Sequence, residues 1–343
     1  MRQKRQINSM RREGESLSKR DSCFICKKPF ASFCNSHTIP QFVLRNIAVD
    51  GNVHRPSIFL NPQDRQSTVG IKGTNTFRVL CSDCDSRYFK GYENPERYSN
   101  VPTGEILAQI ALKNFISRHA KRIKQQGLAQ SMMNYSGASS RIFSDTEDVH
   151  KLDISEYEQQ YEYARNAVEK GWSDRYYLQL SIQLDYVVPI AFQDAIALAV
   201  GFDQCKINDL RNLSPKYRVQ ELHICIFPLK SNSQVFAFTR NDDKRYRSFF
   251  KELRLLDTKE QLQVINYLVL AHSEEVFFSP KLDNKVFGNP SLKDVVSKTM
   301  VIDVPSTYPW INQETGEELV LEAFTCNHAF QTTCLLSAEF ALH

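Results

Sequence analysis

The sequence lacks any apolar run that approaches the roughly 20 residues needed to cross a bilayer. Its first twenty residues also lack the apolar stretch of a secretory signal. The second half has no Walker loop, no Gly-x-Gly-x-x-Gly fingerprint and no nucleophile elbow. We therefore expect a cytoplasmic protein with no membrane partner, whose function is not indicated by the common nucleotide-binding or hydrolase motifs.

Cysteine is too sparse for a disulfide scaffold, because the chain has only nine in 343 residues. Four of them form two Cys-x-x-Cys pairs, Cys23/Cys26 and Cys81/Cys84. A tetrahedral zinc ion takes four soft ligands, and each pair supplies two from one turn. The spacing therefore predicts a structural zinc site, the alternative being a reduced, metal-free core. The other five cysteines are expected to be small buried residues: Cys34, Cys205, Cys225, Cys326 and Cys334.

A strong excess of charge is also missing, since the formal net charge is only +4. The basic residues are nevertheless concentrated near the N-terminus, where the first twenty residues hold Arg2, Lys4, Arg5, Arg11, Arg12, Lys19 and Arg20. A basic arm over residues 1–20 would either follow a phosphate backbone or remain a disordered, solvated tail.

The first half divides into a module, a helix and a linker. Residues 21–100 contain both cysteine pairs and many turn-forming residues, which indicates a small module organised by metal. Residues 104–127 are typical of a helix with a basic second half, ending at Gly127. We assign residues 21–127 to the module with its helix and residues 128–150 to a linker.

The second half, residues 151–343, mixes strand and helix patterns. Apolar and polar residues alternate over 176–192, which predicts a strand, and the segment 222–240 predicts a hairpin. Helices are expected over 246–256 and 258–278. The fold class is therefore α+β, with a larger α+β domain after the module. That domain would sense a trigger, bind a protein partner or form a homo-oligomer.

The order of the motifs resembles the zinc-bearing His-Asn-His (HNH) endonucleases, which have the ββα-metal fold. A first Cys-x-x-Cys pair precedes His37-Thr-Ile-Pro40, and the second pair is followed at once by the polar residue Asp85. The layout is similar to that of the phage recombination endonucleases in this family, whose zinc knuckles bracket a β-hairpin and a helix. The resemblance covers about residues 21–100 and implies a zinc-stapled, treble-clef-like ββα-metal module.

The resemblance also implies roles for three residues. His37 falls on the general base that activates water, Asp85 on the family's asparagine, and Ser36 on its acidic metal ligand. In the family the acid and the asparagine hold one magnesium ion. Because the Ser36 hydroxyl is neutral, the carboxylate of the site would have moved from the hairpin to the helix at Asp85. The implied cofactors are structural zinc and a catalytic magnesium or other divalent cation.

The residues after the second cysteine pair have several readings. If the helix continues, Glu93 lies two turns beyond Asp85 and assists there, while Lys90 contacts phosphate. The aromatic residues of this segment are expected in the core of the module, with base stacking as the alternative: Tyr88, Phe89 and Tyr92.

Two functions follow from these residues. The first is a metal-dependent endonuclease that hydrolyses phosphodiester bonds in DNA, as in phage defence or a mobile element. The second is a catalytically inactive zinc module that binds nucleic acid or a protein. The role of His37 distinguishes the two functions: it would be a general base in the nuclease and a structural histidine in the inactive module. A third possibility is that His37 is a zinc ligand paired with Cys34.

Overall fold

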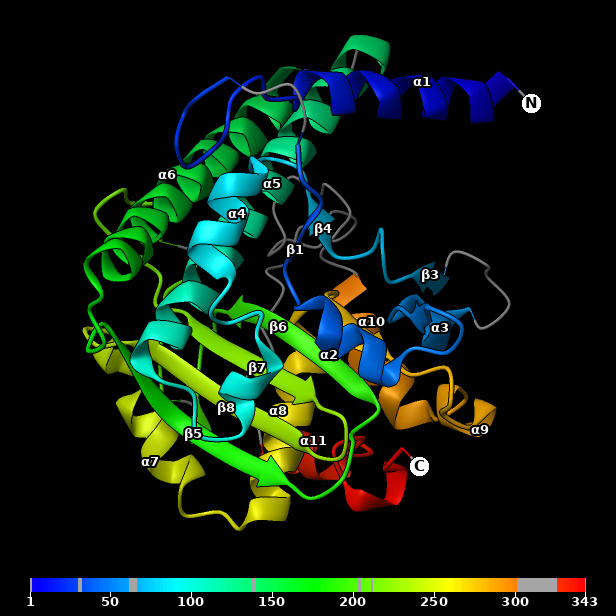
Figure 1. Ribbon diagram of the computed structural model, residues 1–343. Helices are drawn as coiled ribbons and strands as arrows, with labels where there is room; N and C mark the ends of the chain where they lie inside the picture. The colour runs from blue at the N-terminus through cyan, green and yellow to red at the C-terminus, as the bar shows by residue number, and fades with distance from the viewer. Residues whose placement is uncertain are drawn as a thin grey trace.

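A computed structural model describes residues 2–29, 33–61, 67–136, 140–202, 205–210, 212–300 and 326–342. A twisted sheet lies in the lower half of the molecule, and two long helices rise from it beside the first residues of the chain (Figure 1). Within the described residues, no helix is both long and apolar enough to span a membrane.

The main sheet has seven strands in the order β3-β2-β9-β6-β7-β8-β5, and each neighbouring pair is antiparallel. Its strands are β2 (Asn52–His54), β3 (Thr68–Gly70), β5 (Tyr176–Leu184), β6 (Ile190–Ile196), β7 (Leu222–Pro228), β8 (Ser233–Arg240) and β9 (Val276–Phe278). The pairing of β2 with β9 joins the cysteine-bearing first part of the chain to the second half. The two parts that we assigned to separate domains therefore share one sheet.

Both faces of the central strands are buried, which explains their nearly continuous apolar sequences. Along β8, Val235 and Ala237 belong to one apolar cluster, whereas Phe236 and Phe238 belong to another. Strands β6, β7 and β9 divide their residues between the same two clusters, because successive side chains of a strand point to opposite faces. The sheet thus separates two cores.

Helices from the second half cover one of these cores. They are α7 (Arg247–Leu253), α8 (Thr258–His272), α9 (Asn284–Phe287), α10 (Pro290–Met300) and α11 (Cys326–Gln331). The helix α8 begins with a capping box in which Asp257 and Glu260 satisfy each other's backbone N–H groups. It ends at His272, so the helix that we expected over 258–278 is too long, and β9 takes up its last residues.

The cysteine-bearing module and a long helix cover the other core (Figure 1). The small elements of the module are β1 (Ser36–His37), α2 (Gln41–Ile47), α3 (Ser57–Leu60), β4 (Thr76–Phe77), α4 (Ser82–Phe89) and a 3-10 turn, η2 (Pro95–Tyr98). Strands β1 and β4 form a separate antiparallel pair. The short 3-10 turns η4 (Lys244–Tyr246) and η6 (Ala338–Phe340) lie in the second half.

The remaining helices differ from our expectations. Residues that we assigned to a disordered arm form α1 (Arg2–Leu17), and those of the expected linker continue α5 (Gly104–Ser136) and begin α6 (Ser140–Lys170). Helix α1 crosses the far ends of α5 and α6 (Figure 1). Tertiary contacts decide these cases: Glu13 on α1 accepts hydrogen bonds from Ser131 at 3.0 Å and Asn134 at 2.9 Å.

Two glycines allow α1 and α5 to approach closely. A Cβ atom added at Gly127 would lie 2.5 Å from the carbonyl oxygen of Gly14, and one added at Gly14 would lie 2.7 Å from Cα of Leu128. Only residues without a Cβ permit this backbone-to-backbone contact. Gly127 was expected to end the helix, but its role is to let α1 pack against it.

We predict that Gly127→Ala loosens α1. Overpacking of this kind costs about 1–3 kcal/mol, which exceeds the roughly 1 kcal/mol that alanine gains over glycine within a helix. Hydrogen exchange of the amides of residues 9–17 should accelerate. Gly73→Ala is the matched control, because an added Cβ at Gly73 meets no atom within 4 Å. Equal exchange in the two variants would contradict this role.

Candidate metal centre and adjoining acid site

The first cysteine pair lies in a tight turn that aims both sulfur atoms at one point. The N–H of Lys27 donates to the carbonyl of Cys23 at 2.9 Å, and the N–H of Cys23 donates to the carbonyl of Lys28 at 3.0 Å. Lys27 has a φ of 58°, the left-handed conformation that reverses the chain here. The turn therefore holds Cys23 and Cys26 side by side.

The second pair lies at the start of α4. Cys81 is the residue before the first turn of the helix, and Cys84 follows within that turn. The ligand atoms of the four cysteines all lie within 4.8 Å of one another, and the sulfur atoms of Cys26 and Cys81 are 4.0 Å apart. Zinc–sulfur bonds of about 2.3 Å place tetrahedral sulfur atoms about 3.8 Å apart. The four cysteines therefore form a cluster that could hold a metal ion such as zinc.

The thiols of the cluster are electrostatically coupled. Burial raises the pKa of Cys23, but N–H groups of Cys81, Cys26 and Ile25 more than offset this and lower it to about 7. Burial and the neighbouring thiols together raise the pKa of Cys84. Gathering four sulfur atoms disfavours several thiolates at once, whereas a bound cation favours them. The donor set thus suits a soft divalent ion.

Cys34 lies outside this cluster. Its thiol donates to the carbonyl of Leu80 at 3.4 Å, and burial raises its pKa to about 11. The cluster is complete with the cysteines of the two pairs, so a zinc knuckle made by Cys34 and His37 is not what the structure contains. The expectation of burial for the unpaired cysteines is confirmed for Cys225 and wrong for Cys205, which is exposed, whereas Cys34 and Cys334 are only partly buried. The side chain of Cys326 is outside the described residues.

His37 lies on β1, opposite Thr76 of β4. Its Nε2 atom is 3.1 Å from the carbonyl oxygen of Ile71. Because a carbonyl only accepts, the proton of a neutral ring sits on Nε2. The backbone of Asn35 also hydrogen-bonds the ring, and both backbone contacts raise the pKa of His37. Burial is the main cause that lowers the pKa of His37 below its ordinary value near 6.5, and the Lys113 ammonium lowers it further. His37 is therefore a neutral, half-buried base at pH 7.

Ser36 and Asp85 are in direct contact. The buried Ser36 hydroxyl donates to Oδ1 of Asp85 on α4, so the residue before His37 meets the residue after the last cysteine. Lys113 of α5 also donates to Oδ1 of Asp85, at 2.8 Å. We call Ser36, Asp85, Glu93 and Lys113 the acid site.

Glu93 joins the acid site by a different route from the one we expected. Helix α4 ends at Phe89, although the N–H of Glu93 still donates to the carbonyl of Phe89 at 3.1 Å. The Glu93 carboxylate accepts from Lys113 at 3.2 Å. Burial raises the pKa of Glu93, and the Lys113 charge opposes that rise. Asp85 and Glu93 are thus brought together, with an ammonium group between them.

The aromatic residues near the acid site pack in the core, as we predicted. Tyr88, Phe89 and Tyr92 are buried, and the Tyr92 hydroxyl donates to the carbonyl of Thr38 at 3.0 Å. Lys90 is exposed at the end of α4. The aromatic cluster therefore fixes the hairpin against α4 and α5, and base stacking on these three rings is excluded by their burial.

As they are arranged, Asp85 and Glu93 do not fit a magnesium ion. Magnesium needs several oxygen ligands with open lone pairs. Here Oδ1 of Asp85 accepts from both Ser36 and Lys113, and Oε1 of Glu93 accepts from Lys113. Across the described side chains, the four cysteines are the one group of three or more Cys, His, Asp or Glu close enough to hold a metal ion. The expectation of a catalytic magnesium is therefore not supported.

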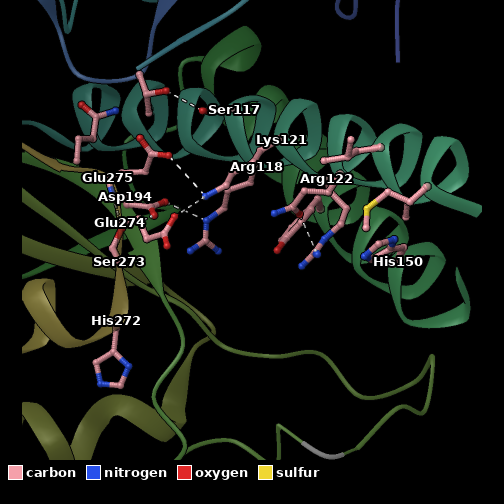
Figure 2. Close-up of a pocket in the computed structure, with 17 residues that line it drawn as sticks. Ser117, Arg118, Lys121, Arg122, His150, Asp194, His272, Ser273, Glu274 and Glu275 are labelled. Atoms are coloured by element: carbon pink, nitrogen blue, oxygen red, sulfur yellow. Dashed lines mark hydrogen bonds and ion pairs between the residues drawn. The ribbon is translucent and has the colours of Figure 1, made fainter. Parts of the chain in front are cut away.

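A cleft of about 370 Å³ adjoins the hairpin. Thr38 lines it, and its hydroxyl is 2.7 Å from that of Ser117 on α5 (Figure 2). Basic residues of α5 reach across toward acids from β6 and from the segment between α8 and β9. These ion pairs are Arg118–Asp194 at 2.9 Å, Lys121–Glu275 at 3.6 Å and Lys121–Glu274 at 3.9 Å (Figure 2).

The cleft combines residues that the sequence treats separately. We noted the basic half of residues 104–127, but the acidic partners of Arg118 and Lys121 are more than 70 residues away in the chain. Only the periodicity of α5 could have indicated that Arg118, Lys121 and Arg122 share one face. The wall of the cleft is therefore mixed in charge.

We predict one zinc ion per chain, measured by elemental analysis of the purified protein. Cys84→Ala should lose the zinc and lower the melting temperature, because metal binding at such a site contributes directly to folding. Cys205→Ala, an exposed cysteine outside the cluster, should keep both. Full zinc content in Cys84→Ala would show that the cluster is not the metal site.

Comparisons of the chain with protein-family models, with curated proteins and with solved structures give no match. A functional proposal therefore rests on the geometry of the module. It consists of the four-cysteine cluster, a neutral histidine on the hairpin, and an acid site beside both.

Proposed function

We propose that the protein is a zinc-stabilised nuclease of the HNH type that hydrolyses phosphodiester bonds in DNA. One observation carries the proposal: the Ser36 hydroxyl meets Asp85, so the hairpin residue beside His37 is joined to the helix residue beside Cys84. This contact brings two of the motif positions of the resemblance, Ser36 and Asp85, into one place, and the charge of Asp85 acts on the adjoining His37. A structure in which β1 and α4 lay apart would offer no such site.

His37 is the proposed general base. With the proton of a neutral ring on Nε2, Nδ1 is the nitrogen that would take a proton from water. The water oxygen would then bond to phosphorus while the bond from phosphorus to the leaving oxygen breaks, and that oxygen takes a proton from solvent. A zinc ion bound by the four cysteines would hold the first turn of α4 and the first cysteine turn in place.

The cleft supplies the proposed contacts to the DNA backbone. Thr38 lies on its wall, so the cleft begins one residue from His37. The side chains of Lys121 and Arg122 are 45% and 27% exposed, and they lie on the wall formed by α5. The electrostatic attraction between phosphates and such basic side chains does not depend on the DNA sequence. The acidic residues opposite them would limit this attraction. We therefore expect the cleft to bind one DNA strand locally, and not to act as a broad cationic binding surface.

If His37 is the general base, the variant His37→Ala should lose DNA cleavage activity. Removal of a general base typically costs about 10²- to 10⁴-fold in rate. Nicking of plasmid, and cleavage of branched and single-stranded DNA, should fall by this amount while the zinc content stays the same. His54→Ala is the matched control, since His54 is another partly buried histidine whose Nδ1 is 2.9 Å from the Thr68 hydroxyl. The assignment fails if His37→Ala cuts as fast as the parent.

The pH dependence gives a second prediction. The active form of His37 is the neutral one, and burial lowers its pKa below 6.5. A lowered pKa keeps the ring neutral to lower pH, so the rate should be retained at pH 6.5 and fall only on further acidification. The measurement is kcat/KM for DNA cleavage against pH, with zinc content checked at each point. An acidic limb centred above pH 6.5 would argue against His37 as the base.

The closed acid site favours a second candidate function. Because Lys113 and Ser36 already occupy Oδ1 of Asp85, the module is also suited to binding DNA without cutting it. Such a binder would show salt-sensitive binding, since phosphate contacts release counterions. It would show no cleavage with any added metal, and His37→Ala would then leave its affinity unchanged.

A further inference from the structure

Lys113 is an unusual lysine, because its side chain is completely buried. It lies on α5 between Leu112 and Asn114, which are also buried. Its ammonium group contacts Asp85 at 2.8 Å and Glu93 at 3.2 Å. An uncompensated buried charge would cost several kcal/mol, so these two carboxylates are necessary partners.

Aromatic rings enclose the rest of the ammonium group. Its nitrogen is 3.9 Å from the ring centroid of Phe89, 5.7 Å from that of Phe77 and 5.9 Å from that of Tyr92. The negative face of such rings attracts a cation. These rings belong to the core of the module, so they also block a path by which the lysine could swing into solvent. The site is therefore built around a cation.

One oxygen of each carboxylate already has a partner, since Oε1 of Glu93 accepts from Lys113. Oδ1 of Asp85 accepts from Lys113 and from the buried Ser36, whose hydroxyl has no second use in the described contacts. A carboxylate oxygen accepts at about two lone-pair positions. A divalent ion at this oxygen would have to displace a buried hydroxyl, a buried ammonium group, or both.

From this arrangement we propose that Lys113 is the resident cation of the acid site, and that Asp85 and Glu93 therefore do not take up a divalent metal ion. Lys113 acts as a positioning residue: it holds the two carboxylates beside His37 and does not touch a substrate. The proposal deepens the proposed function, on which it rests for its catalytic meaning, because phosphodiester cleavage here would then need no divalent ion besides the structural zinc. The claim about metal binding stands independently of cleavage.

The test is a titration of the zinc-loaded full chain with Mn²⁺, followed by the electron paramagnetic resonance signal of free Mn²⁺. The parent protein should leave the added Mn²⁺ free. Lys113→Met removes the charge and keeps the apolar stem, so it should take up one Mn²⁺ per chain. Adding Asp85→Asn to that variant should abolish the uptake. Lys124→Met, on the exposed part of the same helix, is the control and should behave like the parent.

Two results would overturn the proposal. One is stoichiometric Mn²⁺ binding by the parent that Asp85→Asn removes, and this arm does not depend on whether Lys113→Met folds. The other is a folded Lys113→Met, shown by an unchanged zinc content and a cooperative melt, that binds no Mn²⁺. Failure of the nuclease proposal looks different, because it appears in the cleavage of His37→Ala and leaves the Mn²⁺ titrations as they are.

Discussion

The four-cysteine cluster is the constraint on which the module depends. It brings Cys26 and Cys81, which are 55 positions apart, together, and so closes a loop that contains β1, α2, β2, α3, β3 and β4. Closing a loop of this length costs on the order of 3–4 kcal/mol of chain entropy. Within its described residues, the loop contains only strands of two or three residues and helices of four to seven. Elements this short do not form alone, so the cluster and the neighbouring core must hold them.

That neighbouring core belongs to the rest of the protein, which is why the module is not an independent unit. Within the loop, β2 pairs with β3 and also with β9 near the end of the second half. Asn46, in the last turn of α2, donates to the carbonyl of Pro228 at 2.9 Å. The central sheet is buried on both faces only because the module and α5 cover one of them. A sheet of this kind could not be solvated on one face as many antiparallel sheets are.

The sequence predicted what depends on local patterns and failed where distant contacts decide. Spacing was sufficient to predict the cluster of four cysteines, since each pair lies within one turn and two pairs supply the four ligands of one ion. Periodicity was sufficient for most of α8, β5, β7 and β8. It could not predict β9 or β2, because strands of three residues carry no period and their pairing joins residues more than 200 positions apart. Helix α1 was missed and α5 was predicted too short for a similar reason, since contacts such as Glu13 with Ser131 support them.

Within the candidate site, Lys113 was the residue that sequence analysis misread. It stood first in a series of basic residues and was taken as part of a basic helix end. Its position is three residues after Ile110 and seven after Ile106, both buried, which places it on the buried face of the helix. A lysine within an apolar stripe calls for acidic partners, but the stripe does not name them. Asp85 and Glu93 could be identified only once α4 was placed against α5.

The metal cluster and the acid site are coupled because Asp85 directly follows Cys84. When the cluster holds an ion, the first turn of α4 is fixed, and the Asp85 carboxylate is fixed with it. That turn also favours an acid, since the N-terminus of a helix stabilises negative charge by about 0.3–1 kcal/mol. Loss of the ion would release this turn and leave the buried Lys113 without one of its two carboxylates. The metal site and the buried Lys113 ammonium group share no ligand. They nevertheless stabilise each other, because a peptide bond connects Cys84 of the one to Asp85 of the other.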